Sequence, residues 1–183
     1  GRDVGSGQAV DRVTLTPDQD RCLARLFDLR ASGGFRVALV HGVTGSGKTE
    51  VYLQLAERVV HEGARVLVLV PEIALATQTL SRLASRLDRV AVLHSGLTSA
   101  QRAFCYDQIR RGEASVVIGP RSAVFAPAPL LGLIIVDEEH EGSYKQDNVP
   151  RYHARDVAIK RAQMEGIPVI LGSATPSLES LHN

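Results

Sequence analysis

Six short apolar runs, separated by polar or helical stretches, constrain this chain more than any other feature of its sequence. The runs are "FRVALV" (35–40), "RVLVLV" (65–70), "RVAVLH" (89–94), "SVVIG" (115–119), "LGLIIV" (131–136) and "PVILG" (168–172). They are nearly continuous in apolar residues rather than alternating, which is typical of strands that are buried on both faces of a parallel sheet. We therefore expect a mainly parallel sheet with helices on both of its faces.

Helical patterns fill most of the intervals between these runs. They cover residues 16–30, 47–62, 73–87, 98–112 and 153–165. The first pattern has Thr16 as a candidate N-cap, Pro17 in the first turn and an apolar stripe that includes Leu23. Strands that alternate with helices through right-handed crossovers predict a doubly wound α/β domain.

The composition fits one globular domain and argues against several classes of protein. Of the 183 residues, 44% are apolar and 22% are charged, as in ordinary soluble domains. The net charge of +1 means that any contact with nucleic acid depends on a local patch. Two cysteines without a CxxC motif argue against zinc and disulfides, and no apolar stretch could span a bilayer. We expect a cytoplasmic protein without membrane contact, whose Gly-rich residues 1–12 are flexible.

Polar residues follow every apolar run, at the edge where an open parallel sheet binds its ligands. The six strand ends are His41-Gly42, Pro71-Glu72, His94-Ser95, Gly119-Pro120-Arg121-Ser122, Asp137-Glu138-Glu139-His140 and Gly172-Ser173-Ala174-Thr175. Loops are polar in any case, so this pattern alone does not indicate a site. The chemistry of two of the ends does.

The first of these ends is the stretch "GVTGSGKT", which matches G-x-x-x-x-G-K-[ST] between a predicted strand and a predicted helix. Its residues are Gly42, Val43, Thr44, Gly45, Ser46, Gly47, Lys48 and Thr49. The glycines let successive N–H groups face one anion, and the next helix adds its positive end. Lys48 suits the β- and γ-phosphates of ATP, and Thr49 suits Mg²⁺. The alternative is a flexible glycine turn with an exposed lysine.

The second of these ends places three acids directly after the run 131–136. In a phosphate-binding domain this is the Walker B arrangement, in which Asp137 holds Mg²⁺ and Glu138 is the candidate general base for the attacking water. Adjacent carboxylates repel one another unless a cation or hydrogen bonds compensate. A helix N-cap cluster or a solvated turn is the alternative, and the phosphate-loop pattern upstream favours the magnesium role.

Several stretches resemble the superfamily 2 helicases and, more narrowly, the PriA family of primosomal replication-restart helicases. They are "HGVTGSGKTEVY", "LVPEIALATQ", "LHSGL", "GPRSAVFAP", "LGLIIVDEEHEGSYKQDNVPRYHARDVA" and "VILGSATPSLES". The resemblance implies a RecA-like P-loop NTPase fold over residues 13–183, as the first lobe of a 3′→5′ DNA helicase. Such a lobe couples ATP hydrolysis to movement on single-stranded DNA in replication restart and primosome assembly. It also implies a fragment of a larger protein, without the second lobe, the zinc module and the N-terminal DNA-binding domain.

The same resemblance implies roles for individual side chains. Gln19 would read adenine through its amide. Thr16-x-x-Gln19 also matches a capping box, and Gln19 can have both roles at once. Arg121 and Ser122 would contact DNA phosphates, although Pro120 stands where the family usually has threonine and removes a backbone donor. Two hydroxyl residues would couple hydrolysis to movement between lobes, with a hydroxyl-rich turn as the alternative. These are Ser173 and Thr175.

An aromatic-rich segment after the acids resembles a loop of the PriA family that meets single-stranded DNA. Its aromatic faces would stack on bases while its cations follow the phosphates. The segment contains His140, Tyr144, Lys145, Arg151 and Tyr152. The alternative is a solvated loop whose tyrosines pack onto the domain.

The implied ligands are ATP or ADP, Mg²⁺ and single-stranded or forked DNA, with no zinc in this fragment. Primosome proteins and single-strand-binding proteins are the implied partners. We expect the fragment to bind nucleotide and to hydrolyse it weakly, because the second lobe would supply arginines to the γ-phosphate. Two other classes stay open: another P-loop NTPase, such as a small-molecule kinase or a transporter ATPase, and a non-catalytic module that binds DNA or primosome proteins.

Overall fold

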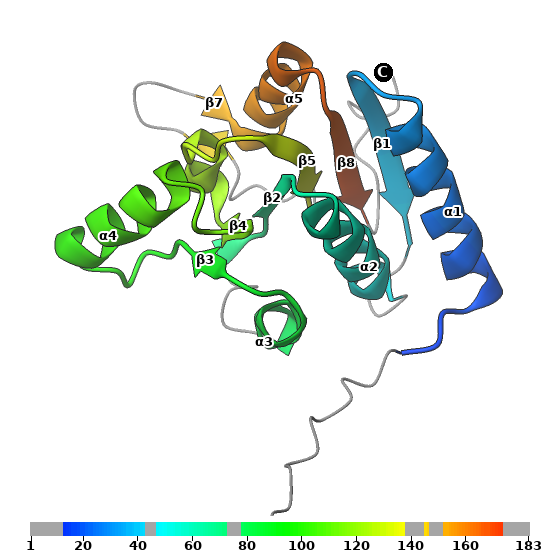
Figure 1. Ribbon diagram of the computed structural model, residues 1–183, viewed down its shortest axis with the longest axis horizontal. Coiled ribbons are helices and arrows are strands. Elements are labelled where there is room, and N and C mark those ends of the chain that lie inside the picture. The colour runs from blue at the N-terminus through cyan, green and yellow to red at the C-terminus, as the bar shows by residue number, and fades with distance from the viewer. Residues whose placement is uncertain (1–12, 43–46, 73–77, 138–144, 147–151, 174–183) are drawn as a thin grey trace, which may run out of the picture.

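The computed structural model describes residues 13–42, 47–72, 78–137, 145–146 and 152–173 of the chain. Within them, six strands form a sheet in the order β1-β8-β5-β2-β4-β3 (Figure 1). The strands are β1 (Arg36–His41), β2 (Arg65–Leu69), β3 (Val90–Val92), β4 (Val116–Gly119), β5 (Leu131–Val136) and β8 (Pro168–Ser173). Every pairing in this sheet is parallel, so the predicted doubly wound α/β fold is confirmed.

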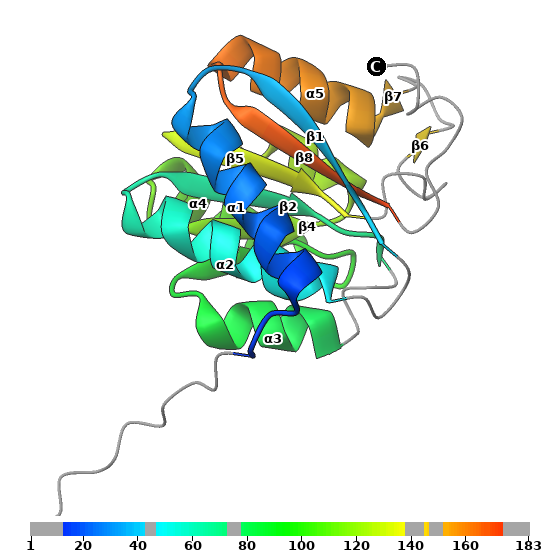
Figure 2. The same cartoon turned by 90° about the vertical axis from the view of Figure 1, so that its right-hand side faces the viewer.

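Both faces of the sheet are buried, which explains why the strand sequences are continuously apolar. In β2, Leu67 and Leu69 belong to one core cluster, whereas Val66 and Val68 belong to the other. Each such buried side chain contributes on the order of 2 kcal/mol to folding. Helices α1 (Pro17–Ala31), α2 (Lys48–His61) and α3 (Gln78–Arg86) cover the valine face, and α4 (Ser99–Arg110), α5 (Ala154–Glu165) and the 3-10 helix η2 (Arg121–Phe125) cover the leucine face (Figure 2). No helix in the described part of the chain is long and apolar enough to cross a membrane.

Local sequence signals set the ends of the helices. At α1, Thr16 Oγ1 accepts from Gln19 N at 3.3 Å, and Gln19 Oε1 accepts from Thr16 N at 2.9 Å. Thr98 and Gln101 form the same reciprocal box at the start of α4. Helix α5 ends at Gly166, whose φ of 66° lies in the left-handed region that favours glycine. The predicted capping box at Thr16 is therefore confirmed.

Three local features differ from the sequence expectations. β3 is shorter than the predicted run 89–94: Arg89 before it has a φ of 55°, outside the β region, although Leu93 N still donates to Ile118 O at 2.8 Å just after the strand. Helix η2 was not predicted; it begins where Pro120 O accepts from Ala123 N at 2.9 Å, in a stretch too short to show helical periodicity. Part of the aromatic-rich segment pairs as a short antiparallel ladder, β6 (Lys145–Gln146) with β7 (Tyr152–His153). By contrast, the predicted helix 73–87 is confirmed from Gln78 to Arg86, and its residues 73–77 lie outside the described residues.

Candidate functional site

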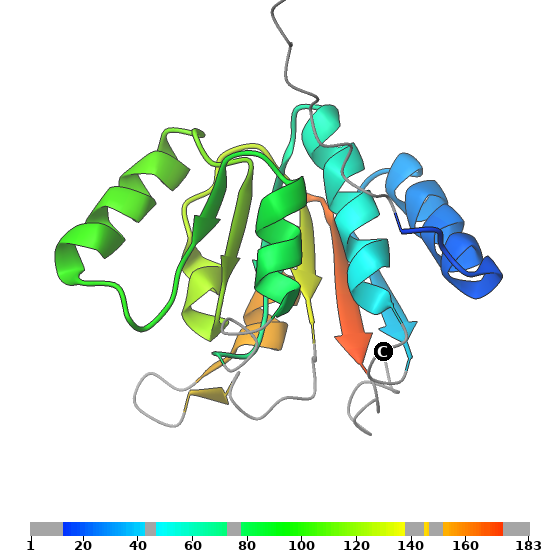
Figure 3. The ribbon, with the colours of Figure 1, turned by 90° about the horizontal axis from the view of Figure 1, so that it is seen from below.

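The carboxyl ends of the parallel strands point to one edge of the sheet, as the arrowheads in Figure 3 show. Because β8 lies between β1 and β5, strand ends that are distant in sequence become neighbours. His41 pairs with Ser173, and Val136 pairs with Leu171. Beyond the last pair, Gly42 N donates to Ser173 O at 3.1 Å. The start of the phosphate-loop pattern and the end of β5 therefore lie on opposite sides of β8. Both are at the edge where such sheets bind ligands.

Residues 47–49 of the phosphate-loop pattern form the start of α2. Gly47 has a φ of 80°, in the left-handed region, and supplies no side-chain cap to the helix. Lys48 and Thr49 follow as the first two helical residues, and both are partly buried. Backbone N–H groups at a helix start, beside a lysine, fit a phosphate group. The intervening residues Val43, Thr44, Gly45 and Ser46 lie outside the described residues.

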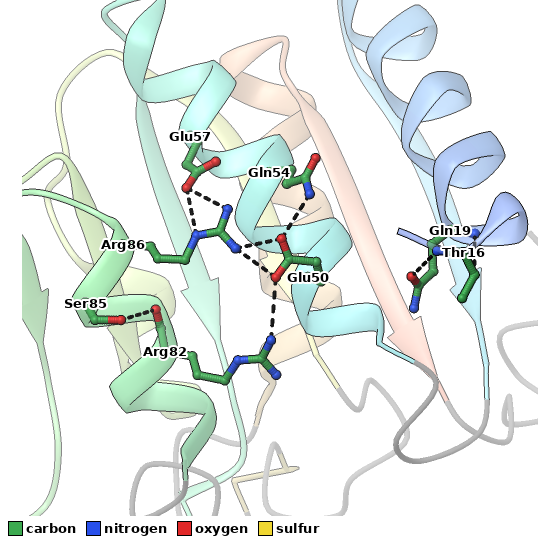
Figure 4. A network of polar contacts seen from close by, with 8 residues as sticks. All are labelled: Thr16, Gln19, Glu50, Gln54, Glu57, Arg82, Ser85 and Arg86. Carbon is green, nitrogen blue, oxygen red and sulfur yellow. Dashed lines mark hydrogen bonds and ion pairs between the residues drawn. The ribbon is translucent and has the colours of Figure 1, made fainter. Parts of the chain in front are cut away.

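The side-chain amide of Gln19 lies against the phosphate-loop glycine Gly47. A Cβ on Gly47 would stand 1.9 Å from Gln19 Nε2. Gln19 Oε1 is bonded to the backbone of Thr16, which fixes the orientation of the amide (Figure 4). Glycine at position 47 permits the left-handed φ, and any side chain there would have to displace the Gln19 amide. The capping box holds Gln19 beside the phosphate loop, and its contact with adenine stays a prediction.

Asp137 lies close to two residues from other elements. Its backbone N–H donates to Leu69 O at 2.9 Å. A Cβ on Gly172 would stand 3.0 Å from Asp137 Oδ1 and 1.7 Å from the Tyr52 hydroxyl, so residues of β5, β8 and α2 converge here. Tyr52 is 3% exposed. Sequence reasoning missed it; the available signal was its spacing of one helical turn from Lys48.

The described oxygen donors suit magnesium. The Thr49 hydroxyl and the Asp137 carboxylate are hard oxygen ligands of the kind that Mg²⁺ takes together with substrate phosphates and water. Over the described ranges, no three His, Cys, Asp or Glu side chains gather into a metal-binding group. Thr49 and Asp137 offer two oxygen ligands, a number that suits an Mg²⁺ ion bound largely through substrate phosphates and water. Glu138, the candidate general base, lies outside the described residues.

A polar pocket of about 350 Å³ lies at the ends of β2, β3 and β4. Its lining residues are Glu72, His94, Ser95, Arg102, Pro120, Arg121 and Ser122. Glu72 Oε1 accepts from Ser95 N at 3.1 Å and from Ser95 Oγ at 2.6 Å. Arg102 Nη2 donates to His94 O at 3.2 Å. Two guanidinium groups, those of Arg102 and Arg121, thus share the pocket with one carboxylate, which favours binding of an anion.

Arg102 was not predicted from the sequence, although the capping box at Thr98 starts α4 directly after the end of β3. Of the predicted coupling residues, Ser173 is fully buried at the end of β8. Lys145 and Tyr152 lie in the β6–β7 ladder, where Lys145 pairs with His153. The others fall outside the described residues: His140, Tyr144, Arg151 and Thr175.

Comparison with known proteins gives consistent matches. The sequence profile of the DEAD/DEAH box helicases matches residues 16–183. The replication restart protein PriA of Bacillus subtilis is 51% identical over 172 residues, which make up 93% of this chain and 21% of that protein. PriA of Synechocystis is 52% identical over 181 residues, or 98% of this chain and 21% of that protein. The chain thus spans about a fifth of the length of these relatives.

The fold has a counterpart among solved structures. RecG bound to a three-way DNA junction superposes with a TM-score of 0.69 and 23% identity, over 92% of this chain and 22% of that one. At this identity the likeness bears on the fold alone. Together with the profile match, it confirms the expected RecA-like α/β fold and the resemblance to PriA that the sequence motifs indicated.

Proposed function

Because this chain belongs to the DEAD/DEAH box helicase family and forms a lobe of a helicase motor, we propose that it is the ATP-binding lobe of a 3′→5′ DNA helicase. Its proposed role is replication restart and primosome assembly in the cytoplasm. One observation carries the proposal: Lys48 and Thr49 begin the helix after β1, while Asp137 directly follows β5, across the intervening strand β8. We further propose that residues 13–183 are the first RecA-like lobe of a longer protein.

Charge and position suggest a role for each group at the nucleotide site. Lys48 and the first N–H groups of α2 bind the β- and γ-phosphates of ATP. Thr49 and Asp137 hold Mg²⁺, which when bound neutralises charge on the phosphates. Glu138 orients the attacking water and accepts its proton. Gln19, fixed by its hydrogen bond to Thr16, donates through its amide nitrogen to adenine.

We propose that single-stranded DNA crosses the ends of β2, β3 and β4. The polar pocket supports this, because the planar guanidinium groups of Arg102 and Arg121 match phosphate geometry. Glu72, the carboxylate of the pocket, is already occupied by two hydrogen bonds from Ser95. Ser122 adds a hydroxyl donor. The tyrosines of the aromatic-rich segment would stack on bases without sequence preference.

Hydrolysis is expected to depend on partners outside these residues. A motor of this family closes its ATP site with arginines from a second lobe, and such a residue is worth about 10³–10⁵ in rate. The isolated chain is therefore expected to bind ADP or ATP with Mg²⁺ and to hydrolyse ATP slowly. Ser173 and Thr175 would couple the two lobes, and forked DNA, primosome proteins and single-strand-binding proteins are the proposed partners.

The proposal is tested by nucleotide affinity, measured with a fluorescent ADP in the presence and absence of single-stranded DNA. Lys48→Ala is expected to weaken binding roughly thirtyfold or more, because a charged hydrogen bond to phosphate is lost. Lys160→Ala is the matched control: Lys160 is an exposed lysine of α5, and its removal should change nothing. Equal affinity of the wild type and Lys48→Ala would refute the phosphate-loop assignment. DNA binding without any nucleotide binding would favour the non-catalytic module.

A further inference from the structure

Glu50 is a buried carboxylate in the first turn of the phosphate-loop helix. It is the third residue of α2, directly after Lys48 and Thr49, and it is 2% exposed. An acid at this position commonly turns back to the helix start, where it satisfies free N–H groups. Here both oxygens of Glu50 accept instead from Arg86 Nη1, at 2.6 and 2.8 Å (Figure 4). A residue of α3 therefore holds this carboxylate toward α3.

The cluster around Glu50 contains two carboxylates and two guanidinium groups, so its formal charges cancel. Arg86, whose side chain is 7% exposed, also donates from Nε to Glu57 Oε1 at 3.1 Å. Arg82 Nη2 lies 3.5 Å from Glu50 Oε2, and Gln54 Nε2 donates to Glu50 Oε1 at 2.9 Å. With Arg86 in place, Glu50 contributes little net negative charge at the start of α2.

The pairing offsets the burial of the Glu50 carboxylate. Burial raises the pKa of Glu50, but hydrogen bonds from Arg86 and Gln54, with the charges of Arg86 and Arg82, outweigh it and hold the pKa below its ordinary value. At Arg86, burial lowers the pKa, and the bonds and charges of Glu50 and Glu57 outweigh that effect and raise it. Removal of Arg86 would take away the hydrogen bonds of 2.6 and 2.8 Å to this buried carboxylate and leave it with the amide of Gln54 and the more distant Arg82.

We propose that Arg86 is a positioning residue for nucleotide binding: it neutralises Glu50 and holds its carboxylate away from the start of α2, which leaves those N–H groups to phosphate. This inference rests on the proposed nucleotide site. An uncompensated Glu50 and a bound phosphate are both anions that favour the same positive helix end. Without Arg86, Glu50 either caps the helix itself or repels the phosphates, and each outcome weakens nucleotide binding.

The test compares the ADP affinity of four proteins at low salt: wild type, Glu50→Gln, Arg86→Met and the double variant. Arg86→Met is expected to bind ADP about tenfold more weakly, because the unneutralised charge of Glu50 at the start of α2 opposes the bound phosphates. Glu50→Gln should bind ADP at least as tightly as the wild type, because glutamine keeps the shape and removes the charge. The double variant should recover most of the lost affinity. Added salt should shrink the difference between Arg86→Met and the wild type.

A purely structural pair predicts a different pattern. In that case Glu50→Gln would lose affinity and the double variant would bind no better than Arg86→Met, and either result overturns the inference. Arg86→Met leaves a buried charge without its main partner and can unfold the chain; the Glu50→Gln and double variants then decide, with circular dichroism as the check of folding. Arg82→Met is the control on the same helix, with a small expected effect because Arg82 is half-exposed. Failure of the wild type to bind ADP would instead reject the proposed function.

Discussion

Replacement of Gly172 by alanine tests the convergence of α2, β5 and β8 with one methyl group. The added Cβ would stand 1.7 Å from the Tyr52 hydroxyl, 2.9 Å from Tyr52 Cζ and 3.0 Å from Asp137 Oδ1. An ordinary carbon–oxygen contact is about 3.3 Å, so the hydroxyl must move by roughly 1.5 Å. Tyr52 is 3% exposed and every residue of β8 is buried, which leaves little room for that movement.

The size of the effect follows from the atoms involved. One extra methyl group in a close-packed core costs about 1–3 kcal/mol, and a clash of this depth places Gly172→Ala near 3 kcal/mol. Tyr52→Phe removes the nearest atom and leaves the contacts of 2.9 and 3.0 Å. In that background Gly172→Ala should cost only about 1 kcal/mol, so the two substitutions should couple by about 2 kcal/mol.

Urea unfolding of the four proteins measures this coupling directly. The midpoints should shift while the slope m stays constant, since the surface exposed on unfolding is the same. A second measurement is ADP affinity with and without Mg²⁺: because Asp137 Oδ1 is also crowded, Gly172→Ala should reduce affinity more when Mg²⁺ is present. The reasoning fails if Gly172→Ala costs the same free energy with tyrosine or phenylalanine at position 52.

Three further predictions address other parts of the molecule. Arg121→Ala should weaken single-stranded DNA binding and reduce its salt slope by about 1, whereas Arg110→Ala, a 69% exposed residue at the far end of α4, should do neither in a fluorescence anisotropy titration. Gly47→Ala should lower the free energy of unfolding by about 1–2 kcal/mol because alanine disfavours the left-handed φ, and by a further amount because its Cβ displaces Gln19. In urea unfolding, the same substitution in a Gln19→Ala background should show only the loss that comes from φ. Stability should fall as pH drops below 4.5, the ordinary pKa of Glu50, and through its lower folded-state pKa, because protonation removes the pairing with Arg86. Thermal unfolding of Glu50→Gln should show a flatter profile in this range, and an equally steep one would contradict the assignment.

Much of the fold could be predicted because strands that are buried on both faces of the sheet have continuously apolar sequences, which are recognisable even when the strands are short. Helix starts could be predicted too, since Thr16 and Gln19 satisfy each other within one turn. The position of β8 between β1 and β5 could not, because strand order depends on which faces the helices cover rather than on any local pattern. The ladder of β6 and β7 is only two residues long on each side, which is too short for periodicity to reveal.

The residues of the candidate site likewise include some that the sequence could predict and some that it could not. The positions of Lys48 at a helix start and of Asp137 after a strand could be predicted from motif spacing, and their roles at ATP stay predictions. Tyr52 and the Glu50–Arg86 pair could not, since their roles depend on which helix faces meet in space; Glu50 and Arg86 are 36 positions apart. In sequence Glu50 looks like an ordinary acid in a first helical turn, and only the fold shows that its partner lies in α3.

The strand order also bears on when the site forms during synthesis. Among the described strands, β1 has one neighbour, β8, which is the last of them to leave the ribosome. β2, β4 and β5 can pair with one another earlier, while the strand that precedes the phosphate loop must wait for Ser173 to emerge. Loop-closure entropy between such distant strands makes this a late and slow step. Completion of the sheet and assembly of the proposed nucleotide site are therefore expected to coincide, and a nascent chain that stops before β8 is expected not to form this site.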